Sequence, residues 1–239
     1  MIGGKPVELN DFPHLKGIFK CGIGRDNIPE QQASLRGIKC GFPSATTASI
    51  IHEETASFAS HLILKSQYLY VGSFHPWSKI TRHSIAKKNL LIVGNGNIGS
   101  RVARKLNAFM NISTYDITNK QSELKDKIEA ADCISIHLPL TSDTKEMFNE
   151  EKLSWMKTGA SLINTARADI VNEDSLYNEL KKGRIKAFFD VFWNEPYHGK
   201  LSKISEEFFH KSPHVASNCK EFLEGTAMDF RKFLYSFKL

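Results

Sequence analysis

The sequence predicts an α/β fold built on a doubly wound parallel sheet, with a second, smaller domain. Short apolar runs of the kind that form buried strands alternate with segments whose apolar residues recur at helical spacing. A glycine-rich turn at residues 94–99 joins one apolar run to a helical segment, and Asp116 ends the next run. Because strands and helices alternate, we expect parallel strands with helices on both faces, the Rossmann-type arrangement.

Five apolar runs form the predicted sheet. Most contain four consecutive residues with little polar alternation, which suits strands that are buried on both faces. The first of them, residues 90–93, leads directly into the glycine turn. The runs cover residues 90–93, 112–115, 133–136, 161–164 and 187–191.

The predicted helices lie between and around these runs. The helix after the glycine turn has Ile98, Val102 and Leu106 on one face, and another ends at Gly183, a typical helix stop. A long stretch from residue 46 to about residue 70 contains no Gly or Pro, which suits a helix connecting two domains. The remaining helices are expected at residues 122–130, 152–156, 172–183 and 222–237, and a short strand at residues 15–19.

Composition and termini narrow the class of protein. The 239 residues are 41% hydrophobic and 24% charged, which argues against a disordered or collagenous chain. No apolar run approaches the roughly 18–20 residues of a membrane helix. The first residues do not place an apolar stretch behind a basic segment, as a secretory signal would. We therefore expect a cytoplasmic protein with no membrane contact.

Charge and metal-ligand patterns argue against a nucleic-acid-binding protein and against a metalloprotein. The formal net charge is +6, but Lys and Arg are scattered, so no nucleic-acid partner is expected. The four cysteines form no Cys-x-x-Cys pair, which predicts reduced thiols. His52 is followed by Glu53 and Glu54 without the second histidine of a zinc helix, so we expect no metal site. His137 is assigned a structural role.

The glycine turn has the spacing of a dinucleotide-binding loop, Gly94-Asn95-Gly96-Asn97-Ile98-Gly99. Gly94 allows the tight turn, Gly96 lets the backbone approach a pyrophosphate, and Gly99 lets the helix pack closely on the sheet. The carboxylate of Asp116 can accept hydrogen bonds from ribose hydroxyls and would repel a phosphate there. The loop therefore predicts NAD, rather than NADP, as the cofactor.

A Walker A phosphate loop is the alternative for these glycines. Gly94 and Gly99 have its four-residue gap, but Ser100 and Arg101 stand where that loop needs Lys and then Ser or Thr. The ammonium group that reaches the phosphates is missing. Nucleotide hydrolysis is therefore excluded.

Three polar residues follow the later strands. A nicotinamide cofactor implies hydride transfer, which needs a cation to polarise the carbonyl and an acid/base for the hydroxyl proton. In a doubly wound sheet such groups lie beyond the carboxyl ends of the strands. Arg167 follows the fourth predicted strand, and Glu195 and His214 follow the fifth. These three residues are the candidate catalytic group.

Six motifs in chain order together resemble the D-isomer-specific 2-hydroxyacid dehydrogenases, the phosphoglycerate dehydrogenase-like group. Upstream, residues 15–28 are similar to the family's substrate-domain loop and residues 53–56 to the start of its interdomain helix. The resemblance thus runs from about residue 2 to the C-terminus. The six motifs are residues 94–99, 137–141, 162–167, 189–192, 195–196 and 212–215.

The resemblance implies a role for each candidate residue. Arg167 would bind the substrate carboxylate and polarise the 2-keto oxygen, for which a guanidinium group is well shaped. His214 would give or take the hydroxyl proton, and Glu195 would hold the imidazole and favour its protonated form. Asp190 would bond to the nicotinamide carboxamide region, and the neighbourhood of Pro139 would line the adenine side.

Further binding residues follow from the same resemblance. Together with the glycine loop and Asp116, the expected cofactor-binding residues are Leu138, Pro139, Thr165, Ala166 and Asp190. Backbone amides would help to hold the substrate carboxylate at Cys21, Gly22 and Ile23.

The resemblance also predicts two domains and a homodimer. Residues 47–214 would form the NAD-binding domain, and residues 1–46 a flavodoxin-like substrate domain on which a C-terminal helix within residues 215–239 packs back. Family members carry a strand-helix-strand start before the segment that resembles residues 2–4, so we expect this domain to be shortened and incomplete. The dimer would form through the helix at residues 46–70 and the cofactor domain.

Two functions are compatible with these observations. The first is an NAD-dependent oxidoreductase that interconverts a small D-2-hydroxy acid and its 2-keto acid, with the identity of the acid left open. The second is a non-catalytic or regulatory NAD-binding dimer derived from the same family. Turnover of a 2-keto acid distinguishes them.

Overall fold

The chain divides into two compact units in the computed structural model, which describes residues 1–3 and 7–237. The large unit comprises residues 55–216, and the small unit comprises residues 1–54 and 217–239. The division at residues 54 and 55 falls within the long helix α2 (Ala45–Gln67), whereas the sequence placed it just inside the start of that helix. Among the described residues, no helix combines the length and the apolar character needed to cross a membrane.

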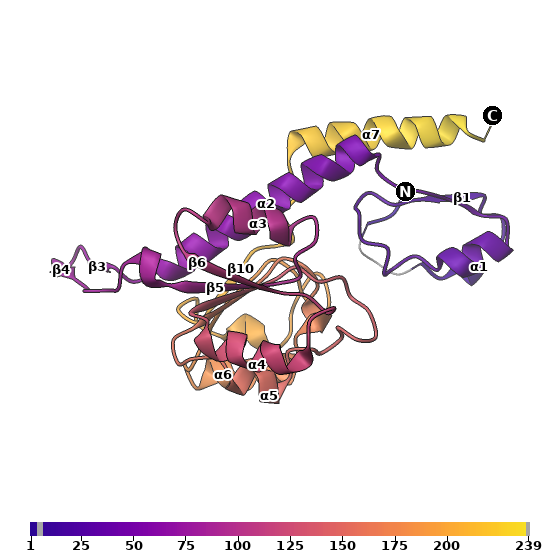
Figure 1. The fold of residues 1–239 in the computed structure, drawn as a ribbon. Helices are drawn as coiled ribbons and strands as arrows, with labels where there is room; N and C mark the ends of the chain where they lie inside the picture. The colour runs from indigo at the N-terminus through magenta and orange to yellow at the C-terminus, as the bar shows by residue number, and fades with distance from the viewer. Residues whose placement is uncertain (4–6, 238–239) are drawn as a thin grey trace. The chain divides into compact units, whose positions relative to one another are not determined.

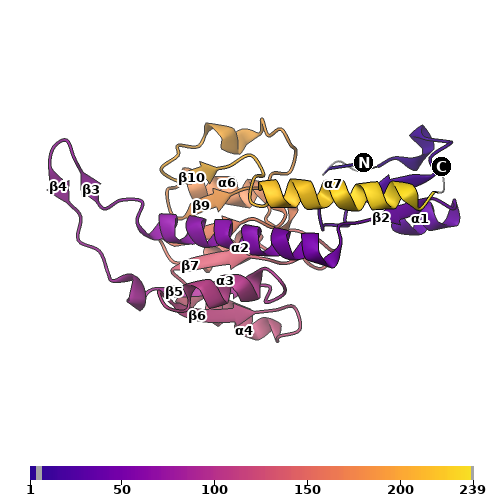
Figure 2. The ribbon, with the colours of Figure 1, turned by 90° about the horizontal axis from the view of Figure 1, so that it is seen from above.

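The large unit is built on a six-stranded sheet in which all neighbouring strands are parallel. The strand order is β10-β9-β8-β7-β5-β6, so the chain runs outward from β5 in both directions; the sheet is seen nearly edge-on in Figure 1 and with its strands side by side in Figure 2. The predicted Rossmann-like fold is therefore confirmed. The strands are β5 (Asn89–Val93), β6 (Asn111–Tyr115), β7 (Cys133–Ile136), β8 (Ser161–Asn164), β9 (Lys186–Phe189) and β10 (Phe209–Lys211).

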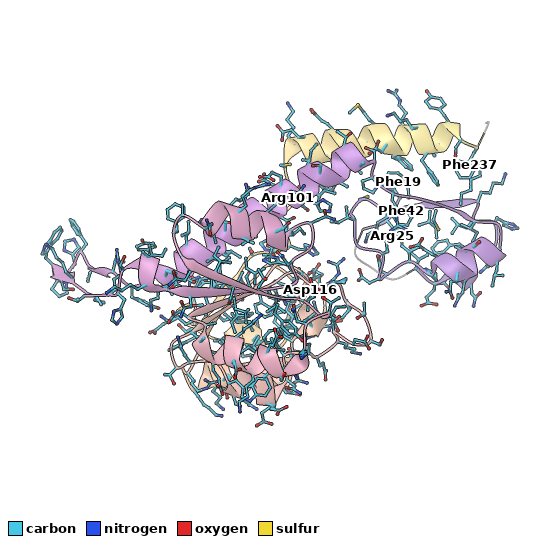
Figure 3. All side chains as sticks on the ribbon, viewed as in Figure 1. Phe19, Arg25, Phe42, Arg101, Asp116 and Phe237 are labelled. Atoms are coloured by element: carbon cyan, nitrogen blue, oxygen red, sulfur yellow. The ribbon has the colours of Figure 1, made fainter. Side chains whose placement is uncertain are left out.

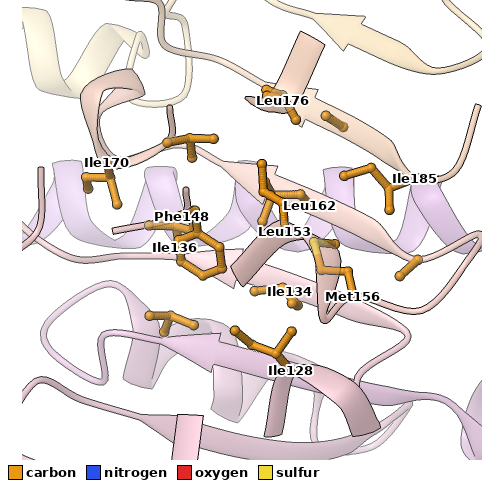
Figure 4. Packing of buried hydrophobic residues seen from close by; sticks show 14 of the residues in the cluster. Ile128, Ile134, Ile136, Phe148, Leu153, Met156, Leu162, Ile170, Leu176 and Ile185 are labelled. Carbon is orange, nitrogen blue, oxygen red and sulfur yellow. The ribbon is translucent and has the colours of Figure 1, made fainter. Parts of the chain in front are cut away.

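Helices cover both faces of this sheet. Alternate side chains of β5 point to opposite faces of the sheet. Leu91 packs in the core on one face, and Leu90 and Ile92 pack with α2 and α3 (Gly99–Leu106) on the other. Figure 4 shows the first of these cores, in which the sheet meets helices α4 to α6. These helices are α4 (Gln121–Ala130), α5 (Glu150–Ser154) and α6 (Glu173–Lys181).

Two parts of the large unit were not predicted from the sequence. The edge strand β10 has only three residues, and a two-stranded hairpin, β3 (Gly72–Ser73) and β4 (Ser78–Lys79), follows α2. Figures 1 and 2 both show this hairpin extending away from the sheet. Its side chains Phe74 and Trp77 are 70% and 73% exposed. Short 3-10 turns occupy residues Leu9–Asp11, Ile85–Lys87, Ala168–Ile170 and Lys200–Lys203.

The small unit contains two parallel strands, β1 (Gly17–Phe19) and β2 (Lys39–Gly41), with helices α1 (Glu30–Leu35) and α7 (Lys220–Tyr235). The C-terminal helix packs on β1 through the rings of Phe230 and Phe233, whose centroids lie 5.3 and 5.6 Å from that of Phe19. The chain after α7 returns to the same strand at Phe237, since a Cβ on Gly17 would clash with its ring. The flavodoxin-like character of this unit remains a prediction.

Candidate active site

The glycine loop between β5 and α3 lies at the carboxyl edge of the sheet, beside the point where strand order reverses. Gly94 has a φ of 97°, a backbone conformation that favours glycine, and its N–H donates to Tyr115 O at 2.7 Å. A Cβ on Gly99 would clash with the carbonyl oxygen of Gly94. Both positions therefore require glycine, as the sequence predicted.

Asp116 is tied to the loop directly. Its Oδ2 accepts a hydrogen bond from the backbone N–H of Asn95 at 2.9 Å, and its Oδ1 accepts one from Ile117 N at 2.8 Å. Figure 3 labels Asp116 at this edge of the sheet, just after β6. A Cβ on Gly96 would meet no atom within 4 Å. The loop therefore presents an open backbone beside a fixed carboxylate, as a pyrophosphate and its ribose require.

The segment after β8 adds a second observation that fits a bound nucleotide. Asn164 is fully buried, and its side chain accepts from Ala166 N and donates to Arg167 O, both at 2.9 Å. These two bonds fix the turn that carries Thr165, which is 8% exposed and whose Oγ1 is buried without a hydrogen-bond partner. A buried hydroxyl of this kind needs a partner. A cofactor bound at the carboxyl edge of the sheet would supply one.

The motif after β7, residues 137–141, belongs to the scaffold around the glycine loop. The side chain of Leu138 is buried in the core, and Pro139 O accepts a hydrogen bond from Thr144 Oγ1 at 2.6 Å. His137 Nε2 lies 2.9 Å from Ser135 Oγ, and burial lowers the pKa of His137 to about 4. This imidazole is neutral near pH 7 and is part of the scaffold.

Glu195 and His214, which are 19 residues apart in the chain, lie in direct contact. The imidazole Nδ1 is 2.9 and 3.0 Å from the two carboxylate oxygens, and Glu195 Oε1 also accepts from Phe192 N at 3.1 Å. Because an ionised carboxylate only accepts hydrogen bonds, Nδ1 carries the proton, and the other ring nitrogen, Nε2, takes no part in this contact. The predicted pair of residues is brought together.

The backbone of His214 is held in an unusual conformation by Asp190. His214 has a φ of 55°, which costs about 1–2 kcal/mol for a residue with a Cβ. The buried carboxylate of Asp190 accepts from Ser212 Oγ at 2.5 Å, Val215 N at 3.0 Å and Ala216 N at 2.8 Å. These bonds fix the residues on both sides of the histidine. Strained residues of this kind cluster at functional sites.

Arg167 lies at the same edge of the sheet. It follows β8, and β9 is the next strand in the sheet, with the N–H of Asp190 donating to Asn164 O at 3.0 Å. The guanidinium Nη1 donates to Ala166 O at 2.8 Å. The convergence of this guanidinium with the Glu195–His214 pair on one substrate remains a prediction.

The three predicted substrate-binding residues, Cys21, Gly22 and Ile23, belong to the small unit. They follow β1 after Lys20, and the N–H of Cys21 donates to Ile2 O at 3.0 Å. Burial raises the pKa of the Cys21 thiol. Their contact with substrate also remains a prediction.

Sequence reasoning missed the role of Ser212. This residue precedes Pro213 at the end of a short edge strand, and no spacing in the sequence connects it with Asp190, 22 positions earlier. The Ser-Pro-His triplet that begins with Ser212 indicates only that a turn occurs there.

The family model for the D-isomer specific 2-hydroxyacid dehydrogenase NAD-binding domain matches residues 57–216. The chain belongs to this family. As a member of the D-isomer-specific 2-hydroxyacid dehydrogenases, it is an NAD-dependent oxidoreductase, and its matched domain coincides closely with the large unit.

Relatives of this dehydrogenase cover almost the whole chain. A glyoxylate reductase of Korarchaeum cryptofilum is 32% identical over 98% of this chain and 77% of its own length. A hydroxypyruvate reductase of Thermotoga maritima is 31% identical over 87% of this chain and 72% of its own length. The crystal structure of a D-lactate dehydrogenase from Aquifex aeolicus, complexed with NAD and lactic acid, matches with a TM-score of 0.81 and 26% identity, covering 98% of this chain and 80% of that one.

Proposed function

We propose that this dehydrogenase interconverts a small 2-keto acid and its D-2-hydroxy acid, with Arg167, Glu195 and His214 as the catalytic residues. The observation that carries the proposal is the contact between His214 Nδ1 and both oxygens of Glu195. The contact joins the two residues that the family motifs assign to proton transfer. It lies beyond the carboxyl ends of the strands, on the side of the glycine loop.

The proton route follows from the geometry of this pair. When NADH is bound, it supplies the hydride for carbon 2 of the keto acid. His214 Nε2 gives its proton to the 2-keto oxygen during reduction and takes it back during oxidation. Glu195 accepts the hydrogen bond from Nδ1–H and thereby orients the ring. The histidine is thus restored by one proton from solvent after each reduction.

Arg167 would hold the other end of the substrate. Its guanidinium group can bind a carboxylate with two parallel hydrogen bonds and polarise the adjacent keto oxygen. The backbone amides around Cys21, Gly22 and Ile23 would bind the same carboxylate. A substrate held in this way presents its 2-keto oxygen to the histidine and its carbon 2 to the hydride donor.

The names of the relatives indicate which acids to test. The curated relatives include a glyoxylate reductase and a hydroxypyruvate reductase, and the solved neighbour contains lactic acid. We therefore propose that glyoxylate and hydroxypyruvate are substrates of this chain, with pyruvate and phosphohydroxypyruvate as comparisons.

The experiment is the oxidation of NADH by the full chain with each of these four acids. We expect turnover of about 1 per second or faster with at least one acid, and its loss in Arg167→Ala. The control is Arg231→Ala, which removes an exposed guanidinium from α7 of the small unit. NADH binding without turnover on any acid would reject the proposed activity and support the non-catalytic alternative.

We also propose that the chain acts as a homodimer. The hairpin that follows α2 exposes Phe74, Trp77 and Ile80, and an isolated two-stranded hairpin is at best marginally stable in water. A second copy would cover these side chains. Sedimentation velocity should show a dimer that dissociates in the double variant Phe74→Ser/Trp77→Ser. A wild-type monomer at all concentrations would reject the proposal.

A further inference from the structure

A cavity lies at the edge of the sheet opposite to the candidate active site. Its volume is about 260 Å³. Lys88, Asp132 and Ala160, which line it, directly precede β5, β7 and β8, so the cavity opens at the amino ends of three parallel strands. The end of α2 and residues 82–85 close its other side. The glycine loop and the Glu195–His214 pair lie at the carboxyl ends of the strands.

The charges that line this cavity do not cancel. The side chains of Arg82, Lys88 and Lys157 are cationic, and Asp132 is the one carboxylate in the lining, which leaves 3 − 1 = +2. His83 adds positive charge when it is protonated. A cavity with this balance attracts small anions and disfavours cations.

The ammonium groups of Lys88 and Lys157 are both paired with one carboxylate oxygen of Asp132. Lys88 Nζ and Lys157 Nζ each lie 3.5 Å from Asp132 Oδ1, while Asp132 Oδ2 accepts from Asn89 N at 2.9 Å. Lys157 Nζ also donates to a backbone carbonyl, Ala130 O, at 2.6 Å. The two lysines share one negative charge, so both retain capacity for an additional anionic partner. Their positions are set before a ligand binds.

Arg82 is positioned by an aromatic ring. Its guanidinium carbon lies 4.6 Å from the centroid of Tyr68, which also lines the cavity. A cation at this distance over a ring is attracted by the ring's negative face, which favours this position of the guanidinium. Gly159 forms part of the wall, has a φ of 82°, and a Cβ there would meet no atom within 4 Å. The wall at this residue leaves room for a ligand.

We propose that this cavity is a binding site for a small phosphorylated metabolite, separate from the site of hydride transfer. A phosphate monoester carries about −1.5 to −2 charges near pH 7, which matches the excess of +2, and lysine and arginine are the side chains that bind phosphate oxygens. A single carboxylate would neutralise only half of the excess. The site does not depend on the proposed catalytic function, because it shares no residue with the catalytic group.

The test is the binding of inorganic phosphate and of glycerol 3-phosphate to the full chain, followed by calorimetry and by the shift in melting temperature. NADH is present throughout to occupy the glycine loop, and chloride keeps the ionic strength constant. We expect saturable binding of both probes and a rise in melting temperature as each saturates, because a ligand that binds the folded state stabilises it. Absence of saturable binding would overturn the proposal.

Two variants of Gly159 test whether phosphate binds in this cavity. Gly159→Asn and Gly159→Asp have the same shape and the same tolerance for positive φ, and differ in one charge. We expect the aspartate variant to bind phosphate at least about tenfold more weakly than the asparagine variant. Equal binding by the two variants would place the phosphate elsewhere and overturn the proposal.

Removal of one cation gives an independent check. Lys157→Gln should weaken phosphate binding, whereas Lys125→Gln, which removes an exposed lysine paired with Glu129 on α4, should leave it unchanged. Arg82→Gln serves as a second variant, since Arg82 lies on the surface and its loss leaves Asp132 fully paired. Retention of wild-type phosphate affinity in both Lys157→Gln and Arg82→Gln would contradict the assignment.

Discussion

Replacement of Asp190 by asparagine tests how the backbone at His214 is held. The carboxylate is fully buried and accepts hydrogen bonds from Ser212 Oγ, Val215 N and Ala216 N. An asparagine has one acceptor oxygen, so at least one of the three donors loses its partner and faces an NH₂ group. A hydrogen bond to a charged group contributes about 1.5–3 kcal/mol, and a buried donor left alone costs a further ~1–3 kcal/mol. We expect the free energy of unfolding to fall by about 2.5–6 kcal/mol.

The same substitution should affect catalysis more than cofactor binding. The left-handed backbone of His214 is maintained by bonds on either side of it, and without them residues 212–216 can relax. The imidazole then loses its fixed place beside Glu195. We expect the rate of 2-keto acid reduction to fall by at least about tenfold, because small errors in position are costly in catalysis, while NADH still binds.

The assay combines urea unfolding, followed by the fluorescence of the 3 tryptophans, with NADH titration and steady-state kinetics. Ser212→Ala is the matched control, since it removes one of the three donors and leaves no donor unpaired, and it should cost only about 1.5–3 kcal/mol. An Asp190→Asn protein that unfolds at the wild-type urea concentration and reduces 2-keto acids at the wild-type rate would refute this reasoning. Loss of NADH binding as the main effect would instead support a contact between Asp190 and the nicotinamide carboxamide.

Three further predictions address the pair, the scaffold and the loop. In Glu195→Gln an amide replaces the carboxylate whose two oxygens both lie within hydrogen-bond distance of His214 Nδ1, so the imidazole is oriented less firmly and the maximal rate of 2-keto acid reduction should fall by at least about tenfold; a wild-type rate would contradict this. Burial lowers the pKa of His137 to about 4, below its value of about 6.5 in the unfolded chain. The unfolded chain therefore takes up a proton at a higher pH than the folded chain does. The free energy of unfolding is highest above about pH 6.5 and declines as the pH falls towards 4. Between about pH 7 and pH 5 the wild type should therefore lose about 2 kcal/mol more unfolding free energy than His137→Gln, measured with urea, and equal losses would show that this histidine does not set the difference. Gly99→Ala should lower the melting temperature, because the added Cβ clashes with the backbone of Gly94. Gly96→Ala should have the wild-type melting temperature but bind NADH more weakly. The opposite pair of results would exclude the proposed loop geometry.

Much of the fold could be predicted because the four inner strands of this sheet, β5, β7, β8 and β9, are buried on both faces. Such strands appear in the sequence as continuous apolar runs, and β7 and β8 begin and end where the pattern placed them. The glycine loop was recognisable because Gly94 and Gly99 are required by backbone geometry rather than by chemistry alone. The edge strand β10, with the sequence Phe-His-Lys, has no such pattern and is defined by pairing with β9.

One contact of the candidate site could be predicted from the sequence, but the hydrogen bonds that support it could not. The contact between Glu195 and His214 was expected from the family motifs and is present. The hydrogen bonds that hold His214 depend on the buried carboxylate of Asp190, and a sequence does not show which carboxylates are buried. The basic cavity was also missed, because Lys157 is far in the chain from Arg82 and Lys88 and is brought beside them only by the fold.

The most direct test of the catalytic assignment is the effect of His214→Ala on the reduction of glyoxylate and hydroxypyruvate by NADH. General acid catalysis by a positioned side chain contributes about 10²–10⁴-fold, so we predict a loss of the maximal rate in this range, with the dissociation constant for NADH within about twofold of wild type. A His214→Ala enzyme that reduces either acid at the wild-type rate would contradict the assignment of proton transfer to this residue.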